Sequence, residues 1–296
     1  MNQHAIHTRN LQKSYDGNTA LRGLDLSVPE GSIYGFLGRN GAGKTTTMKL
    51  LLGLLRRDAG EIFLFGKEIS SEAAAIEARR QIGFVSEEKT LYPFMNVGQV
   101  INFTRPFFPG WRRDLEEKYL QLFRLPLKRS ITRLSKGMNA QLMLLLAMAR
   151  GARLLMLDEP TSGLDPIMTE EVLRELADLA AQDGATIFFS SHQLTEVEQI
   201  CDHVCLIDHG QAVLAGNLDD LKSSYHRVVL TFDEEPHQFA APEMTDHLRR
   251  NGRTISLLTH GDAEAIAAEA RSQGARNAEI HAVSLRELFL DHVKGA

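Results

Sequence analysis

The sequence predicts an α/β protein built on a largely parallel β-sheet. Five short apolar runs, rich in β-branched or aromatic residues, are nearly continuous instead of alternating, which is typical of strands covered on both faces. Segments with helical patterns separate these runs, and strands that alternate with helices indicate a parallel sheet. A length of 296 residues suits one large domain and a smaller one, each with its own core. The five predicted strands span residues 33–38, 81–85, 153–158, 185–191 and 203–208.

An antiparallel flank is expected near the N-terminus. The segment 24–36, LDLSVPEGSIYGF, alternates apolar and polar residues on either side of Pro29, Glu30 and Gly31. Alternation is typical of strands with one face in the core and the other in solvent, and the Pro-Glu-Gly segment is a turn signal. The segment therefore predicts a hairpin in an antiparallel sheet beside the parallel one.

The clearest predicted helix runs from Pro166 to Asp183. Asp165 stands at the N-cap position, and Pro166 occupies the first helical position, where a backbone N–H is not needed. Gly184 follows directly after the last residue, which is where helices commonly end. This helix lies between two predicted strands, as a parallel sheet requires.

Residues from about 87 to 135 contain no comparable buried strand. The segment LEEKYLQLF, residues 115–123, has helical periodicity, and an aromatic cluster, RPFFPGW, lies at residues 105–111. This stretch is therefore predicted to be a helical subdomain inserted into the α/β core.

The pattern changes again near the C-terminal end of the chain. The segments HRVVLTF (226–232) and RTISLLTH (253–260) are typical of strands. A capping box formed by Ser284 and Glu287 predicts the start of a helix. The predicted domains are residues 1–222 for the main unit and 223–296 for a small α+β appendage.

Composition excludes several classes of protein. Charged residues make up 24% of the chain and hydrophobic residues 43%, which describes a soluble globular protein. A net charge of -5 argues against nucleic acid as a partner, because no basic surplus is present to neutralise phosphates. The two cysteines, Cys201 and Cys205, are expected to be reduced, buried side chains in a cytosolic protein.

No segment of the chain is predicted to cross a membrane. The first ten residues are polar, so no secretory signal is expected. The longest uncharged apolar run, Leu142 to Ala149, has eight residues. A membrane-spanning helix needs about 20 apolar residues, so this run is predicted to be a buried helix.

The octet GRNGAGKT, from Gly38 to Thr45, fits the P-loop pattern G-x-x-x-x-G-K-[ST]. Glycines let backbone N–H groups converge on phosphate oxygens, and the N-terminus of the following helix adds partial positive charge. Lys44 is predicted to reach the β- and γ-phosphates and the Thr45 hydroxyl to bind Mg²⁺. The alternative, a glycine-rich turn matched by chance, fits poorly between a predicted strand and a helical segment. The predicted nucleotide-binding residues of this loop are Gly38, Arg39, Asn40, Gly41, Ala42, Gly43, Lys44, Thr45 and Thr46.

Two adjacent acids follow the apolar run in LLMLDEP. Asp158 suits a Mg²⁺ ligand, and Glu159 is placed to polarise the water that attacks the γ-phosphate. The alternative is a strand that simply ends in two acids before Pro160. The P-loop in the same chain favours the catalytic interpretation, with Lys44 and Glu159 as catalytic residues.

The P-loop and the two acids are accompanied by further motifs in the chain order typical of one family. On these motifs, residues 1 to about 220 resemble the ATP-binding-cassette (ABC) ATPases. LSKGMNAQ, residues 134–141, stands at that family's signature position, and SGLD, residues 162–165, at the position of the loop that touches the dimer partner. His192 stands at the position of the catalytic switch histidine, and Tyr15 where the family stacks an aromatic ring on adenine. By itself, such a tyrosine is as often a packing residue, and a lone histidine after an apolar strand is usually structural. The resemblance implies a P-loop NTPase core with an antiparallel flank and an inserted helical subdomain.

The resemblance also implies a head-to-tail dimer that holds two ATP molecules between its subunits. Ser135 and the N–H of Gly137 would contact the γ-phosphate from the far subunit, at the start of a helix. The second ATPase subunit is a copy of this chain or a different one, and the sequence leaves both open.

Two positions depart from the family pattern. The signature is usually L-S-G-G-Q, but Lys136 and Met138 replace its first glycine and its glutamine. The family's loop glutamine corresponds to Glu87, whose carboxylate is either a Mg²⁺ ligand or a solvated loop acid. Both departures resemble a branch of bacterial ABC ATPases that serve separate exporter-type permeases, including drug- and bacitracin-resistance systems. The candidate metal ligands are Thr45, Glu87 and Asp158.

The resemblance implies an ATP-hydrolysing, Mg²⁺-using subunit that powers export through a permease on another chain. Such a subunit is cytoplasmic and peripheral on the inner face of the cell membrane. The alternative is a soluble ABC ATPase that acts on DNA or ribosomes. DNA-associated relatives insert a long coiled coil between P-loop and signature, whereas about 90 residues intervene here. Translation-associated relatives carry two cassettes, whereas this chain has one P-loop. The transported substrate is left open.

Four aromatic residues of the insert bear on the partner. They are Phe103, Phe107, Phe108 and Trp111. They lie where relatives receive the coupling helix of a permease. These rings either form the small core of the subdomain or line an exposed apolar surface that binds a partner.

Overall fold

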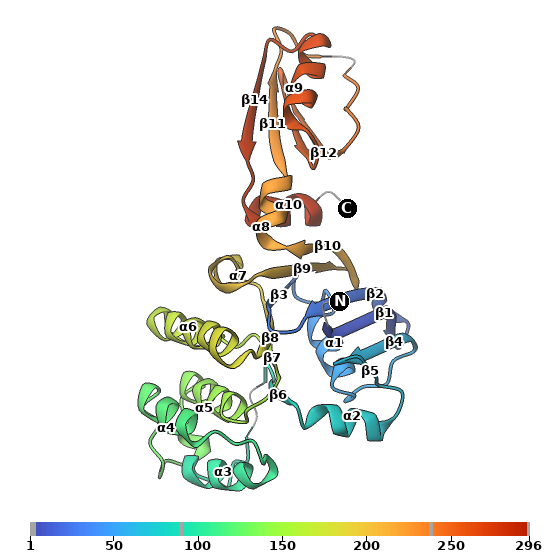
Figure 1. Cartoon of the computed structure of the whole chain (residues 1–296). Helices are drawn as coiled ribbons and strands as arrows, with labels where there is room; N and C mark the ends of the chain where they lie inside the picture. The colour runs from blue at the N-terminus through green and yellow to red at the C-terminus, as the bar shows by residue number, and fades with distance from the viewer. Residues whose placement is uncertain (1–3, 89–90, 237–238, 295–296) are drawn as a thin grey trace. The chain divides into compact units, whose positions relative to one another are not determined.

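The structure, a computed structural model, describes residues 4–88, 91–236 and 239–294 (Figure 1). The chain divides into two compact units, Met1–Ala215 and Gly216–Ala296. The sequence predicted a boundary after residue 222, whereas the chain divides after Ala215, so helix α8 (Leu218–Ser224) falls wholly in the second unit.

A six-stranded sheet forms the centre of the first unit. Its strands are β3 (Ile33–Leu37), β6 (Ile82–Val85), β7 (Leu154–Asp158), β8 (Thr186–Ser191), β9 (His203–Asp208) and β10 (Gln211–Asn217). Their order is β10-β9-β3-β8-β7-β6, and the pairs β3–β8, β3–β9, β6–β7 and β7–β8 are parallel. Every residue of β3, β7 and β8 is buried, which explains their continuous apolar sequences. The five predicted strands and the α/β fold are confirmed.

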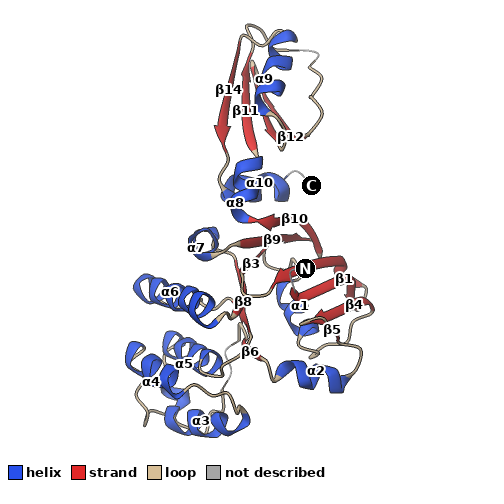
Figure 2. Cartoon of the chain, viewed as in Figure 1, coloured by secondary structure: helices blue, strands red, loops and turns tan. Residues whose placement is uncertain are grey.

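Helices cover both faces of this sheet (Figure 2). One face carries α1 (Lys44–Leu51), and the other carries α5 (Lys136–Met148), α6 (Pro166–Asp183) and α7 (Leu194–Ile200). The N-cap and C-cap of α6 are those that the sequence predicts. The Asp165 side chain accepts a hydrogen bond from the Met168 N–H, and Gly184 ends the helix with a φ of 67°.

A second, antiparallel sheet flanks the first. Its strands are β1 (His4–Tyr15), β2 (Asn18–Pro29), β4 (Ala59–Leu64) and β5 (Lys67–Glu68), in the order β2-β1-β4-β5. The antiparallel flank is confirmed, but the predicted hairpin around Pro29, Glu30 and Gly31 is wrong. Both edges of β3 are taken by β8 and β9, so β2 pairs with β1 instead. The turn at Pro29–Gly31 therefore passes from one sheet to the other.

One apolar core of the first unit is built from both sheets and α1. It joins residues such as Ile6 and Leu24 of the antiparallel sheet to Met48 of α1 and to Phe36 and Phe188 of the parallel sheet. All five are completely buried. Burial of a side chain of this size contributes about 1.5–3 kcal/mol, so this core fixes the strand ends on which the site depends.

The inserted segment is helical where the structure describes it. It contains α3 (Val97–Thr104), α4 (Arg113–Leu122) and 3₁₀ turns at Arg105–Phe107 and Ile131–Arg133. Helix α2 (Glu72–Arg79) precedes the insert. Residues 89 and 90 of the predicted subdomain lie outside the described residues. Between 91 and 135 the extended pairing is a single bridge, Asn96–Ser130. Ion pairs connect the insert to α6, with Arg112 3.2 Å from Asp183 and Lys118 2.5 Å from Glu175.

The second unit is an α+β structure with its own core. Its antiparallel sheet has the order β12-β13-β11-β14, made of β11 (His226–Thr231), β12 (Thr245–Asn251), β13 (Thr254–Thr259) and β14 (Asn277–Ala282). Its helices besides α8 are α9 (Ala263–Ser272) and α10 (Leu285–Lys294). The two predicted strands and the predicted capping box at Ser284 are present, whereas β12, α9 and β14 were not predicted.

In the described parts of both units, no helix combines the length and the apolar character needed to span a membrane.

Candidate active site

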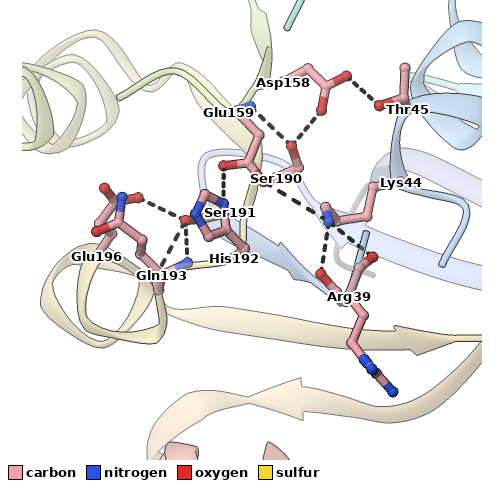
Figure 3. Close-up of polar contacts among 11 residues, drawn as sticks. Arg39, Lys44, Thr45, Asp158, Glu159, Ser190, Ser191, His192, Gln193 and Glu196 are labelled. Carbon is pink, nitrogen blue, oxygen red and sulfur yellow. Dashed lines mark hydrogen bonds and ion pairs between the residues drawn. The ribbon is translucent and has the colours of Figure 1, made fainter. Parts of the chain in front are cut away.

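The P-loop joins the end of β3 to the start of α1, and its backbone packs directly against neighbouring strands (Figure 3). A Cβ on Gly38 would lie 2.5 Å from the carbonyl oxygen of Ile207. Gly43 has a φ of 112°, and a Cβ there would lie 2.9 Å from the carbonyl oxygen of Ala20. Only glycine fits these two positions. The loop borders a pocket of about 340 Å³ lined by Ala20, Arg39, Asn40, Gly41, Gly43, Lys44, Thr45, Thr46, Glu87, Asp158 and Glu159.

Lys44 places a buried positive charge in this pocket. Its side chain is 7% exposed, and its Nζ donates to the carbonyl oxygens of Gly38 at 2.7 Å and Arg39 at 3.3 Å. The same ammonium group lies 3.9 Å from the Glu159 carboxylate. The loop thus holds the cation at the position where an anionic ligand of the pocket requires it.

Asp158 is held through both carboxylate oxygens. Thr45 Oγ1 donates to Oδ2 at 2.8 Å, and Ser190 Oγ donates to Oδ1 at 2.6 Å. Ser190 also accepts from the backbone N–H of Glu159 at 3.0 Å. The register of β7 and β8 pairs Asp158 with Ser190, so parallel pairing places both at the same edge of the sheet. The sequence analysis missed Ser190, although a polar residue ending a buried strand was a usable signal.

The oxygen atoms at this edge suit a magnesium ion. The Thr45 hydroxyl and the carboxylates of Asp158 and Glu87 all line the pocket, and Mg²⁺ prefers such hard oxygen ligands. In the described ranges, no group of three or more His, Cys, Asp or Glu side chains could hold a metal ion by itself. Magnesium commonly combines one or two carboxylates with phosphate oxygens of a substrate, so these residues fit an ion bound together with a nucleotide.

Glu159 is a buried acid in a strained conformation. Its φ of 50° lies in the left-handed region, which non-glycine residues rarely adopt and which is often found at functional sites. Its Oε2 lies 2.8 Å from Nδ1 of His192. Burial raises the pKa of the Glu159 carboxyl, while His192 and Lys44 oppose that shift. An acid whose pKa is raised is better able to accept a proton from water.

Tyr15 is not among the residues that line this pocket. It ends β1, its side chain is 41% exposed, and the Lys13 ammonium lies 5.5 Å from its ring centroid. Asp58 accepts from Lys13 at 2.8 Å and from the Ser14 N–H at 2.7 Å, which holds the end of β1. Adenine stacking by Tyr15 stays a prediction.

The predicted signature residues also lie outside the lining of the pocket. Ser135 is the N-cap of α5, and its hydroxyl accepts from the Met138 N–H at 3.1 Å. A Cβ on Gly137 would lie 2.9 Å from the carbonyl oxygen of Gly163, so the signature turn packs against the segment 162–165. The chain does not bring Ser135 and Gly137 to its own P-loop, which is compatible with a role towards a second subunit.

Comparisons with known proteins agree with this geometry. Residues 21–162 match the ABC transporter family. The chain is 35% identical over 281 residues to the bacitracin transport ATP-binding protein BcrA of Bacillus licheniformis, covering 88% of this chain and 91% of that protein. It is 38% identical to the Nod factor export ATP-binding protein I of Burkholderia orbicola, covering 71% of this chain and 70% of the relative.

A solved structure of the ATP-binding subunit of an ABC transporter superposes with a TM-score of 0.67 at 28% identity. The superposition covers 74% of this chain and 92% of that one. The sequence similarity covers nearly all of a bacitracin transport protein, and the structural similarity covers most of this chain. Both therefore extend well beyond the P-loop. The chain therefore belongs to the ABC transporter ATP-binding proteins and is a transport ATPase.

Proposed function

We propose that this chain is the nucleotide-binding subunit of an exporter whose membrane-spanning helices are on a separate permease chain. The observation that carries the proposal is the convergence of Lys44, Asp158 and Glu159, all buried, at one P-loop pocket. The names of the relatives, bacitracin transport and Nod factor export, support export and favour it over a soluble ABC ATPase that acts on DNA or ribosomes. In this role the chain is cytoplasmic and bound to the inner membrane face through the permease.

The residues of the pocket divide the work of hydrolysis. Lys44 exchanges its backbone carbonyl partners for β- and γ-phosphate oxygens of ATP, and the loop N–H groups bind the same phosphates. Thr45, Asp158 and Glu87 would hold a magnesium ion, which would neutralise phosphate charge. Glu159 orients the attacking water and accepts its proton. Tyr15 stacks on adenine from the end of β1.

A second ATPase subunit, most simply another copy of this chain, completes each site. Ser135 and the Gly137 N–H contact the γ-phosphate bound to the partner, because they start α5 and lie outside their own pocket. Segment 162–165, which packs against Gly137, contacts the partner at the same interface. ATP binding closes the dimer, and hydrolysis releases it.

An exposed aromatic surface is the proposed permease-binding face. It consists of Tyr92, Phe94, Phe103 and Phe107, whose side chains are 48%, 77%, 43% and 64% exposed. Neighbouring rings are 5.4–5.8 Å apart between centroids. The predicted cluster therefore separates into two parts. Phe108 packs under the Arg150 guanidinium at 3.6 Å, and Trp111 Nε1 donates to Glu116 at 2.6 Å, so these two belong to the subdomain.

Mutation of Lys44 and Glu159 tests their proposed roles in ATP binding and hydrolysis. Lys44→Ala is expected to weaken ATP binding, because the phosphate-facing charge is lost. Glu159→Gln is expected to retain ATP, lower turnover by about 100-fold or more, and accumulate a dimer in size-exclusion chromatography. Glu117→Gln, an exposed acid of α4, is the control. Hydrolysis by Glu159→Gln at the wild-type rate would contradict the general-base assignment.

Membrane capture tests the partner. The chain is co-expressed with a candidate permease, a hydrophobic protein of about six predicted spans sought among the neighbouring reading frames. Membranes are then sedimented. The wild type is expected in the membrane fraction, whereas Phe107→Asp is expected to lose about tenfold or more of the bound protein, because an acid replaces an apolar contact. Equal capture of both would remove the aromatic surface from the interface, and no capture of either would contradict the permease proposal.

A further inference from the structure

Three consecutive polar residues follow one another where β8 leads into α7 (Figure 3). Ser190 contacts Asp158 and His192 contacts Glu159, so both face the pocket residues. Ser191, between them, turns to a different residue, the carboxylate of Glu196 in the first turn of α7. Nothing in the hydrolysis scheme above uses Ser191 or Glu196.

The Ser191 hydroxyl connects that carboxylate to the backbone beside His192. Ser191 Oγ donates to Glu196 Oε2 at 2.7 Å and accepts from the backbone N–H of Gln193 at 2.9 Å. Ser191 and Gln193 are the two neighbours of His192 in the chain. One hydroxyl group therefore fixes the backbone on both sides of the histidine.

His192 needs such support because its own surroundings do not hold it. Its side chain is 57% exposed, and its polar contact among the described residues is the one to Glu159. An exposed imidazole changes rotamer freely unless its backbone is fixed. The 2.8 Å separation between Nδ1 and Glu159 Oε2 thus depends on the shape of the turn.

Glu196 is costly as a purely structural residue. It is 3% exposed, and its second oxygen, Oε1, has no hydrogen-bond partner among the described residues. Burial of an incompletely paired carboxylate destabilises a protein, and such groups are found where function requires them. The backbone N–H of Gln193, the N-cap residue of α7, is bonded to Ser191 Oγ, so the contact of the carboxylate with the helix start runs through Ser191.

We infer that Glu196, acting through Ser191, is a positioning residue that holds His192 against Glu159. The inference rests on the proposed role of His192 in hydrolysis. Neither residue touches the nucleotide; their effect is on the geometry of a residue that contacts the general base. Loss of either is expected to slow turnover without weakening ATP binding, because the phosphate-binding residues stay in place.

Steady-state hydrolysis of Mg²⁺-ATP by the full chain tests this. Glu196→Ala and Ser191→Ala are each expected to lower kcat by about tenfold to a hundredfold with KM unchanged, as small misplacements of catalytic groups do. Glu196→Gln is expected to restore most of kcat, because its amide oxygen also accepts from Ser191. The Ser191→Ala, Glu196→Ala double variant should be no slower than either single one. Gln199→Ala, an exposed position on the same helix, is the control.

A double-mutant cycle of Glu196→Ala and His192→Ala tells whether Glu196 positions His192 or only supports the fold. Glu196→Ala is expected to cost nothing further in the His192→Ala background, because the geometry it protects is already lost. An equal loss of kcat in both backgrounds, or wild-type kcat in Ser191→Ala, would overturn the inference. If His192→Ala itself turns over at the wild-type rate, the proposed role of His192 fails and the inference fails with it. If Glu196→Ala does not fold, Ser191→Ala and Glu196→Gln decide the question.

Discussion

Asp158 and Glu159 are adjacent acids that the fold prepares for different tasks. Asp158 has both oxygens held by hydroxyl groups, from Thr45 and Ser190, which fixes its carboxylate as the proposed metal-binding role requires. Glu159 is bound on one side by His192 and approached on the other by Lys44. Burial raises the pKa of Glu159, which favours proton acceptance over metal binding. Glu159 itself has a φ of 50°, in the left-handed region that non-glycine residues rarely adopt.

Glu87 adds a third carboxylate to this pocket, and its replacement should change the metal requirement. Glu87→Gln is expected to retain ATP binding but to raise the Mg²⁺ concentration for half-maximal hydrolysis about fivefold, because a charged ligand becomes neutral. Glu87→Ala should lower turnover more than affinity. Magnesium titrations of the ATPase rate measure both effects, with Glu88→Gln as the matched neighbour. Identical curves for wild type and Glu87→Gln would remove Glu87 from the metal site.

Helix starts in this protein divide into capped and open ones. Side chains cap α3 at Asn96, α6 at Asp165 and α9 at Asp262. α1 begins at Gly43 with no side-chain cap and no acid in its first turn. Its first N–H groups and the positive end of its dipole are therefore available to an anion. This helix start is the feature that suits the loop to phosphate binding.

The capping box of α10 gives a pH-dependent prediction. Glu287 accepts from the Ser284 N–H at 3.0 Å, which with the nearby Arg227 holds the pKa of Glu287 below its usual range. A carboxyl group whose pKa is lowered in the folded state stabilises that state at pH values above its unfolded pKa of about 4.3. This stabilisation is lost as the pH falls through the folded-state pKa. Glu287→Gln is therefore expected to be less stable than wild type near neutral pH and equally stable near about pH 3.

Urea unfolding followed by circular dichroism at both pH values checks this. Glu264→Gln is the matched control, because Glu264 is an exposed acid in the first turn of α9. Equal stability of wild type and Glu287→Gln at neutral pH would contradict a stabilising role for the charged form.

At the scale of the whole molecule, the two units have separate cores. The apolar cluster of the first unit is drawn from residues between Ile6 and Ile207, and that of the second from residues between Val228 and Ala278. Every candidate site residue, up to His192, lies in the first unit. The candidate hydrolytic residues are thus all in one unit.

A shortened chain tests this independence. A protein that ends at Asn217, the last residue of β10, is expected to fold and to bind ATP with an affinity within about twofold of the full chain, because its core and its site are complete. Circular dichroism and ATP titration measure both. A chain that ends at Asp208 is the comparison, because it removes β10 and leaves β9 as a bare edge that should aggregate. Insolubility of the chain ending at Asn217 would show that residues 218–296 complete the first unit.

The sequence by itself determined the features that have short-range causes. Strands such as β7 follow from continuous apolar runs, and the ends of α6 follow from Asp165 and Gly184. The P-loop follows from glycines that the backbone needs at fixed positions, and the acids Asp158 and Glu159 follow from their place after a strand. Periodicity, capping and backbone sterics act over a few residues, so these features can be read from neighbouring letters.

Tertiary structure decided what depends on residues far apart in the chain. The partner of β2 was mispredicted because alternation shows a half-buried strand but not which edge is open to it. Exposure of Phe107 and partial burial of Phe108 beside Arg150 depend on packing of the insert, not on the two identical letters. Ser190 reaches Asp158 only because β8 pairs with β7 in one register. Burial and strand pairing are set by the assembled chain, so local sequence cannot specify them.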